Sequence, residues 1–409
     1  MTDSALRLKN IFNTSVVVAA LGYFVDVYDL VLFLIVGKPS LTDIGVPKDR
    51  IIENFQYLLN VQMIGMLVGG IFWGVLGDKK GRLSVLFGSI LMYSLANVAN
   101  GFVKSLDMYV FLRFIAGVGL AGELGAGITL VSEIMHKEIR GYGTMIVASV
   151  GVVGAVVAAL VARVGWEIAY FIGGGLGISL LLLRIGVFES GIFQKMEERK
   201  VKKGSFFSLF QTGTRATKYL NCILVGLPVW FIIGILVGLA STFAEKLGVQ
   251  GEIVDGTCVM LCYTGLVFGD LASGAISQWL KSRKRVFIIF YVLCILLITT
   301  YLRAANVSAT AFYIIITSLG FSTGFWAIFV TNASEQFGTN LRATVTTTVP
   351  NFVRGSLVLV SMLFKAVVSN YGLIAGTAIV AGIVFLISFV SLYFLPETFG
   401  KDLDYVEEI

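Results

Sequence analysis

The chain has 409 residues, of which 57% are hydrophobic and only 14% are charged, with a formal net charge of +6. Soluble domains carry about 25% charged residues, so this composition excludes an ordinary soluble enzyme and a disordered protein. The basic residues form short clusters between long apolar runs, which is typical of membrane orientation and not of a nucleic-acid-binding face. We therefore expect an integral membrane protein that lies in a lipid bilayer and has no nucleic-acid partner.

Twelve apolar runs follow one another along the chain. Each approaches the length of about 20 residues that a helix needs to cross the hydrocarbon core, so the sequence predicts an all-α membrane protein. Most connections are short, which makes neighbouring helices antiparallel. In chain order the predicted spans are 12–36, 54–77, 83–103, 108–133, 141–163, 166–187, 217–243, 254–280, 285–303, 308–333, 343–366 and 372–395.

The distribution of Lys and Arg predicts the orientation of these spans. Of the 31 basic residues, 21 fall on the side of the two termini, 8 fall on the opposite side, and Arg113 and Arg354 lie within spans. Because cytoplasmic connections carry the excess of basic residues, both termini are expected in the cytoplasm.

The spans divide six and six around the longest connection. We expect an N-terminal half in residues 1–190, a cytoplasmic linker in 191–216 and a C-terminal half with a short tail in 217–409. Two patterns recur across this divide. Glu133 with Arg140 is repeated as Glu335 with Arg342 at an offset of 202 residues, and the segment 74–82 is matched, less completely, near an offset of 200. The halves therefore look like parallel repeats.

Several of these segments resemble a known family. The segment 74–82, Gly-Val-Leu-Gly-Asp-Lys-Lys-Gly-Arg, resembles the loop motif of the major facilitator superfamily, and 113–119 resembles its fourth-helix motif. Segments 122–126 and 396–401 are similar to those of metabolite:proton and sialate or organic-acid symporters, and Asp29 matches a first-helix Asp of aromatic-acid symporters. The resemblance implies the major facilitator fold, with twelve transmembrane helices in two six-helix pseudo-symmetric halves. It also implies a monomer in a bacterial inner membrane.

Three acids within the spans are candidates for proton coupling, because a charged side chain in mid-membrane costs about 2.5–3.5 kcal/mol. Asp26 and Asp29 share one helical face, and two nearby carboxylates resist joint ionisation. One of them should take up a proton readily, although Asp26 can instead pair with an Arg of a neighbouring helix. Glu123, in a glycine-rich stretch, is either a second proton carrier or a buried acid bonded to another helix. The single His136 lies in a connection, so carboxylates must carry the proton.

Two arginines within the spans predict a carboxylate-bearing substrate, because a guanidinium pairs with a carboxylate through two hydrogen bonds. Arg113 either binds substrate in competition with Asp29 or forms a fixed structural ion pair. Arg354 follows Pro350 and Asn351, where a kink would aim Asn351 and Arg354 into a central cavity. Three further substrate candidates, each of which can equally be core or interface, are Trp326, Asn332 and Trp230.

Charged and glycine residues near the cytoplasmic connections are predicted to latch that face when the cavity opens outward. The alternative is plain turn chemistry, in which glycines allow tight bends and basic residues obey topology. The predicted gating residues are Gly74, Gly77, Asp78, Gly81, Arg82, Glu133, Arg140, Asp270, Arg283, Glu335 and Arg342.

Together these features predict a secondary active transporter that couples protons to a small carboxylate-bearing metabolite, either an organic acid or a zwitterion such as an amino acid or betaine. One alternative is a proton-driven exporter of the same fold, for a siderophore or drug-like compound, which the direction of flux distinguishes. A second is a non-transporting membrane sensor, which we would expect to carry an extended cytoplasmic domain. The sequence has no P-loop and no enzyme motif, so we expect no enzyme activity, no cofactor and no metal.

Overall fold

The computed structural model describes residues 14–134, 140–188, 206–401 and 407. Within these ranges the regular secondary structure is helical, apart from one isolated bridge between Gln250 and Ser308. Eleven segments of the described chain are helical, long and apolar enough to cross a membrane, and the shorter apolar helix Ser84–Asn100 stands where the third span was predicted. The predicted all-α membrane fold is confirmed.

The helices of the first half follow the predicted spans closely. Hydroxyl side chains begin several helices of the chain: Ser105, Thr212, Ser282 and Ser308 each accept a hydrogen bond from the backbone N–H three residues on, which satisfies a donor that the helix itself leaves open. The elements of the first half are α2 (Thr14–Asp43), η1 (Lys48–Arg50), α3 (Ile51–Lys80), α4 (Arg82–Asn100), α5 (Leu106–Leu120), α6 (Glu123–Ile134), α7 (Arg140–Val161), η2 (Ala162–Val164) and α8 (Trp166–Phe188).

The second half repeats this order after the linker. The predicted linker 191–216 lies partly outside the described residues, and its last part holds a short 3-10 turn and the start of a helix. The elements are η3 (Phe206–Phe210), α10 (Gly213–Leu224), α11 (Leu227–Phe231), η4 (Ile232–Val237), α12 (Ala240–Leu247), α13 (Asp255–Leu280), α14 (Arg283–Leu302), α15 (Ala309–Ser322), α16 (Trp326–Gln336), α17 (Thr339–Tyr371) and α18 (Leu373–Phe394).

Three predicted spans are interrupted helices. The fourth breaks between α5 and α6, the tenth breaks between α15 and α16, and the seventh is divided into α10, α11 and α12 by Pro228 and the π-helical η4. In contrast, α17 runs through Pro350 as one continuous helix. Hydropathy detects a length of apolar chain and not the continuity of its hydrogen bonds, so these breaks were not predicted.

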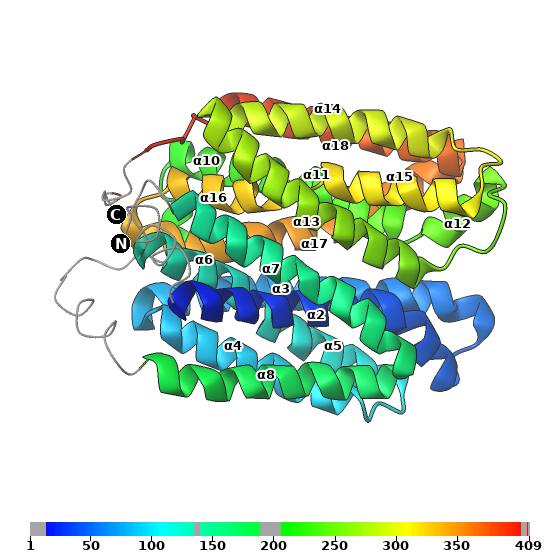
Figure 1. Cartoon of the computed structure of the whole chain (residues 1–409), viewed down its shortest axis with the longest axis horizontal. Coiled ribbons are helices and arrows are strands. Elements are labelled where there is room, and N and C mark those ends of the chain that lie inside the picture. The colour runs from blue at the N-terminus through cyan, green and yellow to red at the C-terminus, as the bar shows by residue number, and fades with distance from the viewer. Residues whose placement is uncertain (1–13, 135–139, 189–205, 402–406, 408–409) are drawn as a thin grey trace, which may run out of the picture.

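The helices lie side by side along the long axis of the molecule (Figure 1), and α2 begins at the end of the bundle where α18 finishes. We call this the terminus end, and the opposite end, which holds Asp43 and Leu373, the far end. The first half packs within itself through α2, α7 and α8 and through α3, α4 and α5, while α13 packs on α15 in the second half. Where the halves meet, α3 and α6 contact α17, and α7 and α2 contact α13; this contact surface is called the seam.

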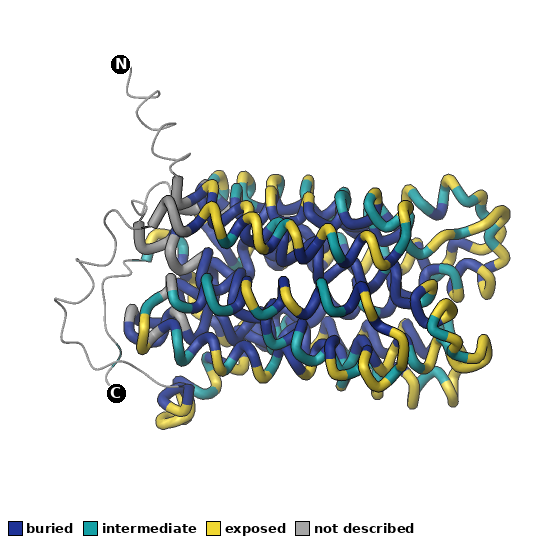
Figure 2. The backbone as a smooth tube through the Cα atoms, turned by 90° about the horizontal axis from the view of Figure 1, so that it is seen from below, coloured by how far each residue is buried: buried dark blue, intermediate teal, exposed yellow. Residues whose placement is uncertain are grey.

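Large apolar side chains lie on the outside of the bundle as well as in its core. Leu182, Phe268 and Leu359 are 64%, 61% and 71% exposed, and Figure 2 shows buried residues in the interior of the bundle and exposed residues along its outside. Because lipid cannot satisfy hydrogen bonds or charges, charged side chains within the spans must find partners in the interior.

The duplication is visible in how the glycines pack. A Cβ atom on Gly65 of α3 would lie 2.4 Å from the Phe114 carbonyl oxygen of α5, and one on Gly265 of α13 would lie 2.0 Å from the Thr317 oxygen of α15. Only glycine permits this backbone contact. The two glycines are separated by the offset of the repeated sequence, so the two halves share one packing frame.

Candidate functional site

An ion pair at the seam joins the two halves. Asp26 of α2 lies with its Oδ2 atom 3.8 Å from Nη2 of Arg354 on α17. The two residues are 0% and 2% exposed, and neither carboxylate oxygen of Asp26 accepts a hydrogen bond from a described residue. Arg354 also donates from Nη1 to Oδ1 of Asn351 at 3.3 Å. The pair is therefore held by charge, with hydrogen-bonding capacity on Asp26 to spare.

A tryptophan and a tyrosine complete this group. Trp326, the first residue of α16, donates from Nε1 to the Tyr23 hydroxyl at 3.0 Å. Its ring lies 5.7 Å from the guanidinium carbon of Arg354, a cation–π contact. We call Tyr23, Asp26, Trp326, Asn351 and Arg354 the seam cluster. Tyr23 was not predicted, although its position three residues before Asp26 places it on the same helical face.

Asn351 fixes the seam on the terminus side of the ion pair. Its Nδ2 atom donates to the Ala121 carbonyl, at the break between α5 and α6, and to the Thr347 carbonyl, both at 2.7 Å. A Cβ on Gly70 would lie 3.1 Å from the Asn351 side chain. Two of the predicted substrate residues, Asn351 and Arg354, thus lie together with Trp326 and Asp26.

Arg113 sits in a second polar group within the first half. It donates to Oδ1 of Asn100 at 3.2 Å and of Asn97 at 3.3 Å, and its guanidinium carbon lies 4.9 Å from the Tyr170 ring. Asp29 interacts electrostatically with Arg113 and with the side chain of Asn97, but its oxygens accept no hydrogen bond of normal geometry from a described residue. We call Asp29, Asn97, Asn100 and Arg113 the Arg113 cluster.

The Arg113 cluster contains buried polar atoms with open hydrogen-bonding capacity. Nδ2 of Asn97 and Nη1 of Arg113 are buried, like the Asp29 oxygens, and none of these atoms has a hydrogen-bond partner of normal geometry among the described residues. Both polar atoms of Gln62 on α3 are likewise buried and have no hydrogen-bond partner among the described residues. Buried polar groups are normally paired with protein or ordered water, so an open cluster of this kind suits water or a polar ligand. Gln62 and Asn97 are uncharged and were not predicted.

Glu123 lies in a closed ion pair inside the first half. It pairs with Arg184 of α8 through both carboxylate oxygens, and both side chains are fully buried. Arg184 also donates to the Leu86 carbonyl at 3.0 Å. Gly22 makes room for the pair, because a Cβ there would overlap the Glu123 carboxylate and the Arg184 guanidinium.

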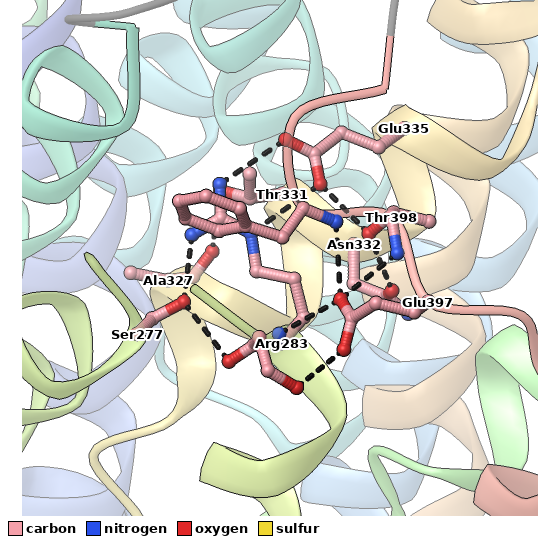
Figure 3. A network of polar contacts seen from close by, with 10 residues as sticks. Ser277, Arg283, Ala327, Thr331, Asn332, Glu335, Glu397 and Thr398 are labelled. Atoms are coloured by element: carbon pink, nitrogen blue, oxygen red, sulfur yellow. Dashed lines mark hydrogen bonds and ion pairs between the residues drawn. The ribbon is translucent and has the colours of Figure 1, made fainter. Parts of the chain in front are cut away.

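At the terminus end, the second half holds a network of polar contacts (Figure 3). Arg283 donates from Nη2 to Oε1 of Glu335 at 3.2 Å and from Nη1 to the Ser277 hydroxyl at 2.8 Å. The Thr398 hydroxyl contacts Oε2 of Glu335 at 2.8 Å and Oδ1 of Asn332 at 3.1 Å. Asn332, predicted near the substrate, therefore lies in this network and not at the seam, because it faces the same side of α16 as Glu335.

Glu397 ties the end of the chain to the start of α14. It accepts hydrogen bonds from the Ser282 hydroxyl at 2.5 Å and from the backbone N–H of Arg283 at 2.8 Å and Phe399 at 3.0 Å. Partial burial alone would raise the pKa of Glu397, but these hydrogen bonds outweigh it and hold the pKa below its ordinary value. The segment 396–401 was singled out by its resemblance to symporters, but the contact of Glu397 with the start of α14 was not predicted.

The remaining predicted gating residues are partly accounted for. Gly81 has φ 90° and forms the bend between α3 and α4, and Gly77 accepts its N–H. Gly74 packs against Thr344 of α17. Arg342 is buried in α17, and Trp230, which was predicted near the substrate, is buried in α11. Asp270 lies near the middle of α13, where Oδ1 accepts the Ala327 N–H at 3.0 Å. The side chains of Asp78, Arg82, Glu133 and Arg140 fall outside those that the structure describes.

A family model described as Major Facilitator Superfamily matches residues 19–361, and the chain belongs to this family. The chain is 27% identical over 343 residues to a probable 4-methylmuconolactone transporter of Cupriavidus pinatubonensis (79% of this chain, 76% of that protein). It is 26% identical over 350 residues to a putative niacin/nicotinamide transporter of Bacillus subtilis (82% and 84%). The fold is similar to that of the proton:xylose symporter XylE, with a TM-score of 0.70 at 15% identity over 97% of this chain and 98% of XylE.

The family match settles the coarse function. Relatives are named as transporters of small metabolites, and the chain is a membrane transporter of this family and not an enzyme.

Proposed function

We propose that the protein is a proton-coupled symporter of small ring-bearing carboxylates, with the seam cluster as the substrate site. The observation that carries the proposal is the Asp26–Arg354 ion pair, which is buried, crosses the seam and leaves Asp26 without hydrogen bonds from described residues. A substrate carboxylate that makes two hydrogen bonds to the guanidinium can replace a partner held by charge alone.

Charge balance then couples the substrate to a proton. One guanidinium neutralises one carboxylate, so a bound substrate acid leaves Asp26 as a second, uncompensated anion in a buried site. Protonation of Asp26 removes that charge, so substrate and proton bind together. Asp29, three residues further along α2 beside the unpartnered atoms of the Arg113 cluster, is the site from which Asp26 receives the proton.

The neighbouring groups favour a ring next to the carboxylate. Trp326 offers a flat aromatic face beside Arg354, and the Tyr23 hydroxyl can turn from Trp326 to a ring substituent. Niacin, named together with nicotinamide for one relative, is a planar ring carboxylate of this type. Symport of one proton with one monoanionic carboxylate carries no net charge, so the pH difference across the membrane drives accumulation. A difference of about one pH unit corresponds to about 1.4 kcal/mol and sustains about ten-fold accumulation.

We also infer that the terminus end faces the cytoplasm of a bacterial inner membrane, because 21 of the 31 basic residues fall on that side. Exposed Lys48 at the far end and exposed Lys281 at the terminus end allow a direct test. In intact cells, a membrane-impermeant maleimide should label Lys48→Cys, and Lys281→Cys only after permeabilisation. The reverse pattern would invert the orientation.

The function is tested by proton uptake into proteoliposomes that contain a pH dye. Nicotinate should acidify the lumen and nicotinamide, which has the same ring without the charge, should not. Asp26→Asn should abolish the acidification. Equal acidification by both compounds would refute recognition of the carboxylate by Arg354. Proton entry driven by outward flux of a preloaded compound would instead favour the exporter, and silence with a panel of ring acids, amino acids and betaines would refute the proposal.

A further inference from the structure

The helix that carries Trp326 begins without a cap of its own. Its N-cap residue, Phe325, makes no side-chain hydrogen bond, and the first turn of α16 contains no acidic residue. The first N–H groups of a helix have no partner within the helix and give that end a partial positive charge. Because α16 begins inside the bundle, water cannot readily satisfy them.

Asp270 of α13 supplies what α16 lacks. Its Oδ1 atom accepts the Ala327 N–H at 3.0 Å, and the residue is 0% exposed. The approach depends on two glycines, since a Cβ on Gly324 would lie 2.3 Å from the Cα atom of Gly269. The Asp270 carboxylate also interacts with the backbone N–H of Trp326, while its Oδ2 atom is buried and accepts no hydrogen bond of normal geometry from a described residue.

The corresponding break in the first half is built differently. There the broken span restarts as α6, whose first-turn acid, Glu123, pairs with Arg184. The residue of α3 that corresponds to Asp270 at the repeat offset is Gly70. Asp270 therefore has no acidic counterpart at this position in the first half. It occurs in the half whose broken helix places Trp326 at the seam.

We propose that Asp270 is a positioning residue for the substrate site. By capping α16 from α13 it fixes the start of that helix, and this holds Trp326 against Arg354 and within hydrogen-bonding distance of Tyr23. Asp270 thereby sets the affinity for a ring-bearing acid without touching it. This inference rests on the proposed function of the seam cluster.

The test compares Asp270→Ala with Asp270→Asn, whose amide oxygen accepts the same N–H. Loss of a cap corresponds to a change of about 2- to 30-fold in an equilibrium constant, so Asp270→Ala should raise the KM for nicotinate by that factor. Asp270→Asn should stay within about two-fold, because Asn and Asp cap equally well. A matched control is Asp43→Ala, which removes an acid that holds a different tryptophan, Trp166, at the far end through a 2.8 Å hydrogen bond.

A second readout needs no substrate. The fluorescence contributed by Trp326, obtained by subtracting the spectrum of the same variant with Trp326→Phe, should shift in Asp270→Ala and remain unchanged in Asp270→Asn and Asp43→Ala. If Asp270→Ala fails to fold, Asp270→Ser, which keeps a shorter acceptor, takes its place and should give a smaller shift in the same direction.

Two outcomes overturn the proposal. The first is a wild-type KM and fluorescence in Asp270→Ala. The second is loss of proton uptake in Asp270→Asn with an unchanged Kd for nicotinate, which would make Asp270 a proton carrier. If wild-type protein takes up no acid, the proposed function fails, while the fluorescence comparison still decides whether Asp270 positions Trp326.

Discussion

Replacing Arg354 by Gln should weaken both the fold and the binding of a substrate acid. At the observed 3.8 Å and an effective dielectric constant of about 20, the attraction to Asp26 is about 4 kcal/mol. This agrees with the roughly 3–5 kcal/mol lost when one partner of a buried ion pair is removed. A hydrogen bond to a charged group contributes about 1.5–3 kcal/mol, so the Kd for nicotinate should rise about 10- to 150-fold.

The assay compares apparent unfolding temperatures in detergent at one heating rate, because the unfolding of such proteins is governed by rate, together with nicotinate binding. Arg303→Gln, an exposed arginine at the far end, is the control and should behave as wild type. Combining Arg354→Gln with Asp26→Asn removes both charges, so it should recover most of the stability but none of the affinity. A single variant as stable and as tight as wild type, or a double variant as unstable as the single one, would refute the charge argument.

Three further predictions concern the other contacts. Glu123→Gln leaves Arg184 buried without its counter-charge and should cost about 3–5 kcal/mol in stability, while the proton:substrate ratio measured with the pH dye stays unchanged; an altered ratio would make Glu123 a proton carrier. The far-end pair of Lys38 and Asp255, 2.5 Å apart with partly exposed side chains, crosses the seam but should contribute at most about 1 kcal/mol. Lys38→Ala should therefore change the uptake rate less than about five-fold, with a difference that shrinks at high salt. For Glu397, hydrogen bonds lower the pKa below the ordinary 4.5, so its stabilisation is present above that value and lost as pH falls below it. Glu397→Gln should lower the unfolding temperature at pH 7, and this difference should shrink below about pH 4.5; a constant difference would exclude the carboxylate as its cause.

The membrane spans were predictable because the bilayer imposes one length and one polarity on every crossing helix. The interruptions were not, since they depend on tertiary contacts such as Gly324 against Gly269. The two-half architecture was predicted from the repeat of Glu133 with Arg140 as Glu335 with Arg342 and from the segment 74–82. Gly65 of α3 and Gly265 of α13, which make equivalent contacts in the structure, were not part of that prediction.

Charged residues of the candidate site stood out individually, but their partners did not. Asp26 and Arg354 each cost free energy in a span, which marks them in a sequence, whereas their pairing depends on how α2 and α17 face each other across the seam. Uncharged polar residues such as Gln62 and Asn97 cost less and gave no comparable signal. Asn332 was placed near the substrate because of its position in a span, although the side of α16 on which it lies takes it into the Glu335 network.

The location of each ion pair relative to the seam determines what it can do in a transport cycle. Glu123 and Arg184 belong to one half, so rigid-body rocking of the halves leaves their distance unchanged. Among the described residues, Arg354 forms its ion pair with Asp26 across the seam. Movement of one half relative to the other must therefore break or re-form this pair. Breaking it is costly unless Asp26 takes a proton and Arg354 takes an acid. We therefore expect the switch between the two open states of the transporter to depend on the binding of proton and substrate at the seam. Energy coupling is then expected to depend on the Asp26–Arg354 pair and not on the Glu123–Arg184 pair.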